Sequence, residues 1–337
     1  HVFGRAKVIP DLALAKGREA HRYAKEIGDP NLEFLAAGGT AMTLLDLGEI
    51  EDANGWIDRA ASVATEHPSP LRARRLETWR GIGDAAAGDA VGMRAHLERA
   101  VQQAADSGLP AARCEALARL AAESARLGAS VADEDLLALA ERSAAEASAL
   151  CGTLSGHAPW GAQADAARAR VGLARGRTEE ATTLARAAID ALEAARHEDL
   201  NLEVLLPCAR ILMEAGAPEW EAEVRPFVRF SLAMVAQRTM DEDVRVRWLR
   251  GPLGTEMAEL AGPIEAAGTT GAGDDERVDG DTRLLQSIVQ GKTNAEIAGE
   301  LGIDEAAVAR RLGELYVTIG ASSRADATAF AFRERVL

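Results

Sequence analysis

The stretch GDAVGMRAHLERAVQQA, residues 88–104, decides the fold class. It opens with Gly88, continues through a polar turn, and then places alanine and leucine at helical spacing. Two further stretches have the same form: GEIEDANGWIDRAASVA from Gly48 and GRTEEATTLARAAIDAL from Gly176. Small residues at fixed helical positions let a neighbouring helix approach closely, so the pattern predicts pairs of helices stacked as a solenoid.

The glycines also set the length of the predicted repeat. Gly48, Gly88 and Gly128 are spaced by 40 residues, and Gly176 follows after 48. Between residues 10 and 262, Gly, Pro and Asp break the sequence into predicted helices of roughly 15 to 20 residues. This resembles a tetratricopeptide-like array with longer and less regular repeats. An irregular helical bundle is the alternative.

Composition supports an all-α fold and limits the kinds of partner. Only 4% of the 337 residues are aromatic, and Ala, Leu, Arg and Glu dominate, which favours helices over sheets. The formal net charge of −15 excludes a surface built throughout to attract nucleic acid. Any contact with DNA must therefore be local.

The cysteines and the hydropathy pattern predict a cytoplasmic protein. Cys114, Cys151 and Cys208 lie far apart, without CxxC spacing, so we expect unpaired thiols in a reducing compartment. No apolar run is long enough for a membrane span, and no signal peptide precedes the first predicted helix. Because the chain begins with His1, we expect a processed product or a part of a longer protein.

A change of composition marks a domain boundary. Residues 263–280, PIEAAGTTGAGDDERVDG, are rich in Gly, Thr and Asp and lack apolar periodicity, which predicts a flexible linker. We therefore expect a helical-repeat sensor or interaction domain over residues 1–262. A small C-terminal domain is expected over residues 281–337.

The C-terminal domain contains Gly291-Lys292-Thr293, the ending of a phosphate-binding loop. Such a loop needs a glycine five residues before the Gly-Lys pair and a preceding strand. The chain has Gln286 at that position, and residues 282–290, TRLLQSIVQ, which precede Gly291, have helical spacing. The sequence therefore excludes a phosphate-binding loop.

The same segment passes the tests for a helix-turn-helix. Thr293 and Glu296 form a capping-box pattern that starts a helix. Gly302 follows where a tight turn requires positive φ, and Asp304 is suited to cap the next helix. That helix carries an apolar face that begins with Val308. Two short helices at this spacing predict a second helix that enters the major groove.

Residues 291–331, GKTNAEIAGELGIDEAAVARRLGELYVTIGASSRADATAFA, resemble the LuxR-type (NarL/FixJ/GerE-like) DNA-binding domain. The matching positions are Thr293, Asn294, Glu296, Ile297, Ala298, Val308, Leu312, Tyr316, Gly320, Ser322, Ser323 and Arg324. The resemblance implies a small four-helix domain that dimerises through its fourth helix. Together with the array, the whole chain resembles the C-terminal part of large ATP-binding LuxR-type regulators. Those regulators carry an ATPase module ahead of the array, and nothing resembling it occurs here.

The resemblance predicts the DNA-binding residues but also shows departures. The predicted set is Lys292, Thr293, Asn294, Ala306, Ala307, Val308, Arg310, Arg311, Ser323 and Arg324. The family usually has lysine where this chain has Ala306 and Ala309. Residues 281–337 hold seven Lys and Arg against eight Asp and Glu, so we expect a monomer to bind DNA weakly.

These patterns predict a transcription regulator in which the array senses a ligand or protein partner and the helix-turn-helix binds promoter DNA. We expect a homodimer, no membrane partner, and neither a catalytic nor a cofactor or metal site, because no nucleophile elbow or HExxH spacing occurs. The alternative is a protein-interaction scaffold whose degenerate helix-turn-helix serves in docking or dimerisation. A third possibility is a fragment of a signalling ATPase.

Overall fold

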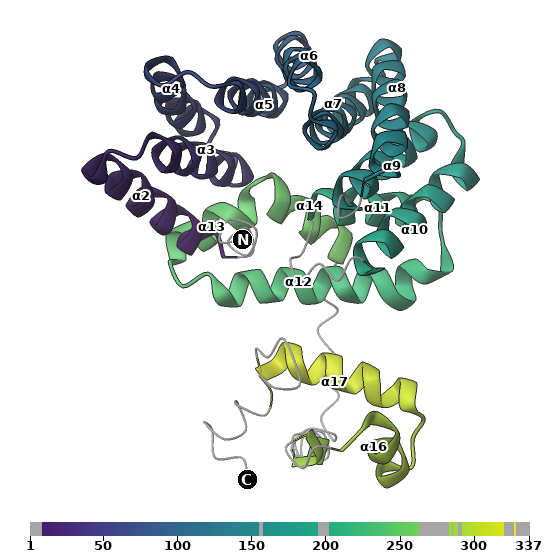
Figure 1. The fold of residues 1–337 in the computed structure, drawn as a ribbon. Helices are drawn as coiled ribbons and strands as arrows, with labels where there is room; N and C mark the ends of the chain where they lie inside the picture. The colour runs from purple at the N-terminus through teal and green to yellow at the C-terminus, as the bar shows by residue number, and fades with distance from the viewer. Residues whose placement is uncertain are drawn as a thin grey trace. The chain divides into compact units, whose positions relative to one another are not determined.

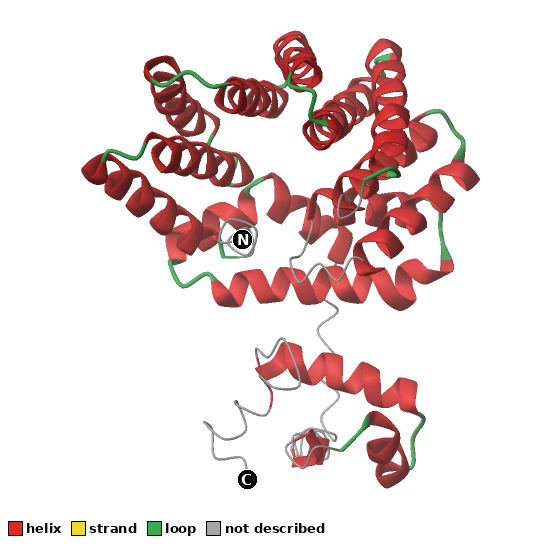
Figure 2. Cartoon of the chain, viewed as in Figure 1, coloured by secondary structure: helices red, strands yellow, loops and turns green. Residues whose placement is uncertain are grey.

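A computed structural model describes residues 9–154, 158–194, 202–262, 283–284, 286–288, 292–319 and 327. Every regular element in these ranges is a helix, which confirms the all-α prediction (Figures 1 and 2). The chain divides into two compact units. Unit 1 comprises His1–Arg225 and Thr239–Leu260, and unit 2 comprises Pro226–Arg238 and Ala261–Leu337. The predicted linker, residues 263–280, lies outside the described residues.

Unit 1 begins with a succession of helices that pack in sequence order. They are α2 (Pro10–Ile27), α3 (Pro30–Asp46), α4 (Ile50–Glu66), α5 (Pro70–Ala87), α6 (Ala90–Asp106), α7 (Pro110–Val131), α8 (Glu134–Cys151), α9 (Ala158–Ala174), α10 (Thr178–Ala194) and α11 (Leu202–Glu214). A short π-helix, η1 (Trp220–Val224), follows α11. The remaining helices of unit 1 are α13 (Glu242–Arg250) and α14 (Pro252–Ala261), and α12 (Arg225–Arg238) belongs almost entirely to unit 2.

The helices of unit 1 form two layers. The odd-numbered helices α3, α5, α7, α9 and α11 each contact the next odd-numbered helix and so form one layer. The even-numbered helices α4, α6, α8 and α10 each pack between two consecutive odd-numbered ones. The layer of odd-numbered helices therefore runs from one end of the succession to the other, as Figure 1 shows.

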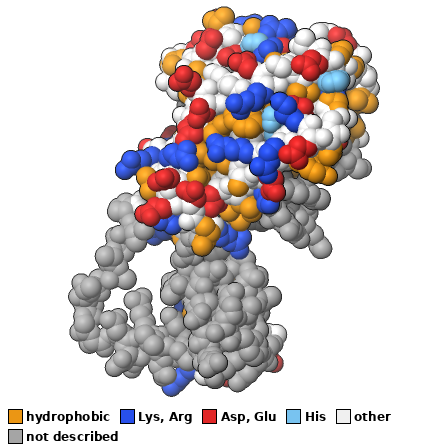
Figure 3. Space-filling model, turned by 90° about the vertical axis from the view of Figure 1, so that its left-hand side faces the viewer, with side chains coloured by type: hydrophobic (Ala, Val, Ile, Leu, Met, Phe, Trp, Pro, Cys, Tyr) orange, Lys and Arg blue, Asp and Glu red, His pale blue; other side chains and the backbone are white. Residues whose placement is uncertain are grey.

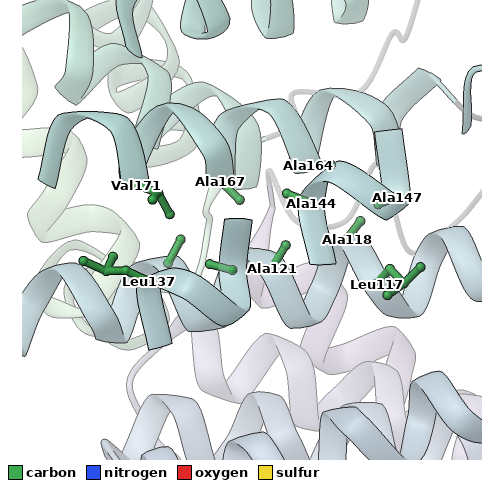
Figure 4. Close-up of a cluster of buried hydrophobic side chains, with 11 residues drawn as sticks. Leu117, Ala118, Ala121, Leu137, Ala144, Ala147, Ala164, Ala167 and Val171 are labelled. Atoms are coloured by element: carbon green, nitrogen blue, oxygen red, sulfur yellow. The ribbon is translucent and has the colours of Figure 1, made fainter. Parts of the chain in front are cut away.

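Alanine forms most of the core between α7, α8 and α9. A cluster from α7, α8 and α9 contains buried side chains that are mostly alanine (Figure 4). Its members are Leu117, Ala118, Ala121, Ala125, Leu137, Ala140, Ala144, Ala147, Ala164, Ala167 and Val171. This arrangement explains the small residues in the sequence, because helices whose facing side chains are short approach more closely.

The last two helices of unit 1 return to its beginning. Asp11 on α2 accepts hydrogen bonds through Oδ2 from the backbone N–H groups of Met240, at 2.8 Å, and Asp241, at 3.0 Å. Arg247 on α13 pairs with Glu49, at the start of α4. At the other end, Arg210 on α11 pairs with α14. Helices α13 and α14 thus connect the two ends of the succession.

Most predicted helix breaks are confirmed, but the break at Gly128 is wrong. Helix α7 continues to Val131, and Ala132 adopts the left-handed conformation with φ 55°. Gly128 lies inside the helix, where an added Cβ would stand 3.0 Å from both Leu136 Cβ and Leu137 N. This glycine is therefore explained by the close approach of α8, and its regular spacing of 40 residues does not mark a helix start.

The structure also corrects the prediction of unpaired thiols. Cys114 on α7 and Cys151 at the end of α8 form a disulfide, with their Cα atoms 6.0 Å apart. They are 37 residues apart in sequence, but the packing of α7 on α8 brings them together. Cys208 is buried and free, and burial raises the pKa of its thiol to about 12.

The disulfide gives the first testable prediction. We expect thiol titration of the denatured but unreduced protein to find one reactive cysteine, Cys208, because the other two are joined. In the folded protein, Cys208 should not react with iodoacetamide, since a thiol with a raised pKa holds little thiolate. Three reactive thiols after denaturation would contradict the disulfide.

Candidate nucleic-acid interface

Helix α16 (Asn294–Leu301) begins at the predicted capping box. The Thr293 backbone N–H donates to Glu296 Oε2 at 2.7 Å, and the Glu296 N–H donates to Thr293 Oγ1 at 3.3 Å. The hydrogen bond from the Thr293 backbone lowers the pKa of Glu296. The carboxylate therefore stays ionised, and the box intact, at neutral pH.

A tight turn joins α16 to α17 (Glu305–Ile319). Gly302 ends α16 with φ 67°, a left-handed conformation that favours glycine. Asp304 then accepts a hydrogen bond through Oδ1 from the Ala307 N–H at 2.6 Å, which caps α17. The turn chemistry predicted from the sequence is confirmed at both positions.

The two helices share one buried core. Its fully or largely buried members are Leu284, Ile288, Ile297, Ala298, Val308, Leu312, Leu315 and Ala327. Val308, Leu312 and Leu315 recur at the spacing of one helix face. This stripe fixes which side of α17 is turned away from the core and available to a ligand.

Arg310 lies on that available side. It is two residues from the fully buried Val308, which places it about 200° round the helix, and its side chain is exposed. Arg311 is half-buried at the edge of the stripe. Neither arginine forms a hydrogen bond or an ion pair with the part of the chain that the structure describes. The two guanidinium groups can therefore bind phosphate or a guanine edge without breaking a contact.

Two of the exposed residues near Arg310 on α17 are small. Ala309 and Gly313 are both exposed, and no heavy atom lies within 4 Å of a Cβ added at Gly313. A helix face with short side chains can lie deep in a groove, because little of it collides with the groove walls. These short side chains lie on the same helix as an exposed arginine, Arg310.

Lys292 differs from the two arginines because its charge is already paired. Its Nζ lies 2.6 Å from Glu300 Oε1, at the far end of α16. An exposed ion pair of this kind contributes little to stability, but it offsets the positive charge that a phosphate would meet. Sequence reasoning missed this pair, since Lys292 precedes the helix and Glu300 is eight residues away.

The other predicted DNA-binding residues differ in burial and in the role that each has in its helix. Thr293 is used by the capping box, and Asn294 is the first residue of α16. Ala307 is half-buried and Val308 is a core residue with 0% exposure, so Val308 offers no surface to DNA. Ala306 lies in α17. Ser323 and Arg324 lie outside the described residues.

On the face of the described chain shown in Figure 3, basic side chains lie next to one another across the middle, with acidic side chains above and below them. Among the described residues, no group of three or more His, Cys, Asp or Glu side chains is placed to hold a metal ion. None of the described helices is long and apolar enough to cross a membrane.

Comparison with known proteins agrees with the geometry of α16 and α17. Residues 281–331 match the model of the family described as bacterial regulatory proteins, luxR family. No curated protein matches the chain. The C-terminal part of this chain is therefore a luxR-family helix-turn-helix domain, which confirms the resemblance found in residues 291–331 and supports a DNA-binding transcription regulator.

Proposed function

We propose that this protein is a transcription regulator that binds promoter DNA through α17 and senses an effector through unit 1. The observation that carries the proposal is the pair Arg310 and Arg311, held unpaired on the second helix of a capped helix-turn-helix. In this motif the second helix enters the major groove, with its exposed side chains toward the bases. A DNA-binding role inside a bacterial cell also places the protein in the cytoplasm.

The proposal includes the organisation of the chain. Residues 1–262 form the sensor, residues 263–280 a linker, and residues 281–337 the DNA-binding domain. The two-layer packing of α3 to α11 supports a tetratricopeptide-like array, because stacked helix pairs produce one continuous layer. Two copies of the chain would bind two half-sites, and doubling the phosphate contacts would offset the low positive charge of one domain.

DNA binding by the whole chain tests the proposal. We expect fluorescence anisotropy with a labelled random-sequence duplex to show binding at low salt that weakens steeply as salt rises. The logarithm of the affinity should fall with the logarithm of salt by about 0.9 per phosphate contact. Selection from a random duplex library should then enrich a two-fold-symmetric site. Absence of binding at the lowest salt, with the chain folded and dimeric, would overturn the DNA-binding role.

A second function is favoured by the charge of the domain. Lys292 is paired with Glu300, and the family's lysine positions are Ala306 and Ala309. These features are expected of an interaction scaffold whose helix-turn-helix has lost DNA binding and serves in docking or dimerisation. Capture of a protein partner by a chain that fails to bind DNA would favour the scaffold over the regulator.

A further inference from the structure

Unit 1 contains a cavity of about 510 Å³ between its odd-numbered helices and α14. This volume is typical of sites for small organic ligands. Apolar side chains from α3, α5, α11 and α14 form much of the wall: Met42, Trp79, Ile82, Leu206 and Leu253. Helix α14 belongs to the segment that connects the two ends of unit 1. The wall is therefore complete only when this segment is packed against the other helices.

The carboxylates on the wall are already neutralised. Four of them pair with an arginine: Glu115 with Arg74, Glu123 with Arg126, Glu203 with Arg119, and Glu256 with Arg210. A fifth carboxylate on the wall, Asp46, has a partner as well. An incoming cation would have to compete with these pairs, so the wall does not favour one.

Arg170 on α9 is the exception among the wall's charged residues. It lines the cavity and is half-buried, yet it forms no hydrogen bond or ion pair with any residue in the described ranges. Glu256 and Glu123 act on it only through their longer-range charge, and burial lowers its pKa. A guanidinium remains charged at neutral pH despite such a shift, and a partly buried positive charge without an ion-pair partner favours an anion.

Gln163 provides a second unsatisfied group on the same wall. Its side chain is 3% exposed, and its Oε1 has no hydrogen-bond partner, whereas its Nε2 donates to Glu203 at 3.3 Å. Gln163 and Arg170 are seven residues apart on α9, which places both on one face, about 10 Å apart along the helix. A buried acceptor without a donor favours a ligand that carries a hydroxyl or N–H group.

We propose that this cavity binds a small amphiphilic anion. Arg170 holds its carboxylate, phosphate or sulfonate group, a hydroxyl or N–H group of the ligand donates to Gln163, and the apolar body contacts Trp79 and its neighbours. The proposal deepens the sensing role proposed above by naming the class of effector. It also explains why one wall arginine is left without a carboxylate.

Two fluorescent probes with one skeleton test the charge requirement. 1-Anilinonaphthalene-8-sulfonate is an amphiphilic anion with an N–H group, and N-phenyl-1-naphthylamine is the same molecule without the sulfonate. We expect the full chain to bind one equivalent of the sulfonate. Arg170→Met should weaken that binding by about tenfold or more, because it removes a charged hydrogen-bond partner. Binding of the neutral probe should stay within about twofold, since the variant side chain keeps its apolar stem.

Two further variants separate charge from folding. Arg170→Lys should restore most of the affinity for the sulfonate, and Arg142→Met, at an exposed arginine on the even-numbered helix α8, should leave it unchanged. Equal losses for both probes in Arg170→Met, or no binding by the unaltered chain, would overturn the anion site. These titrations contain no DNA, so their failure would leave the DNA-binding role intact.

Discussion

Replacing Arg310 and Arg311 together by alanine is expected to weaken DNA binding by at least about 30-fold. Each base or phosphate contact from an arginine contributes about 1–3 kcal/mol, and the described part of α17 has no other basic side chain. Both arginines form neither hydrogen bonds nor ion pairs with described residues, so the substitution should leave the fold unchanged. Anisotropy titrations at fixed low salt would measure the loss.

A matched control removes the same charge elsewhere. Arg18 on α2 and Arg142 on α8 are exposed and, like the α17 pair, form no ion pair within the described ranges. Their joint replacement by alanine should change DNA affinity by less than about threefold, the size expected for a distant and screened charge. Equal losses in both double variants would show that net charge alone determines affinity, and that α17 does not read DNA.

The opposite change at α17 should strengthen binding. Lysine at positions 306 and 309 would restore the charge that the luxR family usually has there, and Ala309 is exposed. We expect Ala306→Lys with Ala309→Lys to steepen the salt dependence by about 0.9 per new phosphate contact. Damage to the fold cannot strengthen DNA binding in a salt-dependent way. Weaker binding without the arginines and stronger binding with the added lysines would together indicate that this side of α17 faces DNA.

The sequence predicted the local features of unit 1 and of the helix-turn-helix. Capping boxes, turn glycines and apolar stripes depend on neighbours within a few residues, and the starts of α4, α6, α10 and α16 were therefore identified. Gly128 was misjudged because a glycine at a helix end and one at a close helix crossing have the same sequence signature. Only the contact with Leu136 and Leu137 distinguishes them.

Most of the other features that the sequence did not predict depend on contacts between distant segments. The disulfide joins Cys114 to Cys151, and Arg247 pairs with Glu49 across 198 positions of the chain. Nothing in a local pattern indicates that α13 returns to the first helices. The cavity and the unpaired Arg170 follow from that return, because α14 completes the wall. The two helices of the helix-turn-helix were thus accessible to sequence reasoning, and the proposed effector site was not.

Replacing Gly254 by alanine is expected to destabilise unit 1 by about 3 kcal/mol, the upper part of the usual range for an overpacked position. Gly254 is buried in α14, and an added Cβ would stand 2.2 Å from the Trp248 backbone oxygen and 2.7 Å from Leu249 Cα. Both atoms belong to the backbone of α13, so no rotamer change can relieve the clash. Helices α13 and α14 must therefore move apart.

The same substitution at Gly55 should have the opposite sign. Gly55 lies exposed within α4, and no heavy atom comes within 4 Å of an added Cβ. Alanine there should raise stability by about 0.5–1 kcal/mol, because glycine loses more conformational freedom in a helix. Thermal melts should show a midpoint about 5–10 °C lower for Gly254→Ala and slightly higher for Gly55→Ala. If Gly254→Ala melted at or above the unaltered chain, α13 and α14 would not pack this closely. The closed wall around Arg170 would then lose its support.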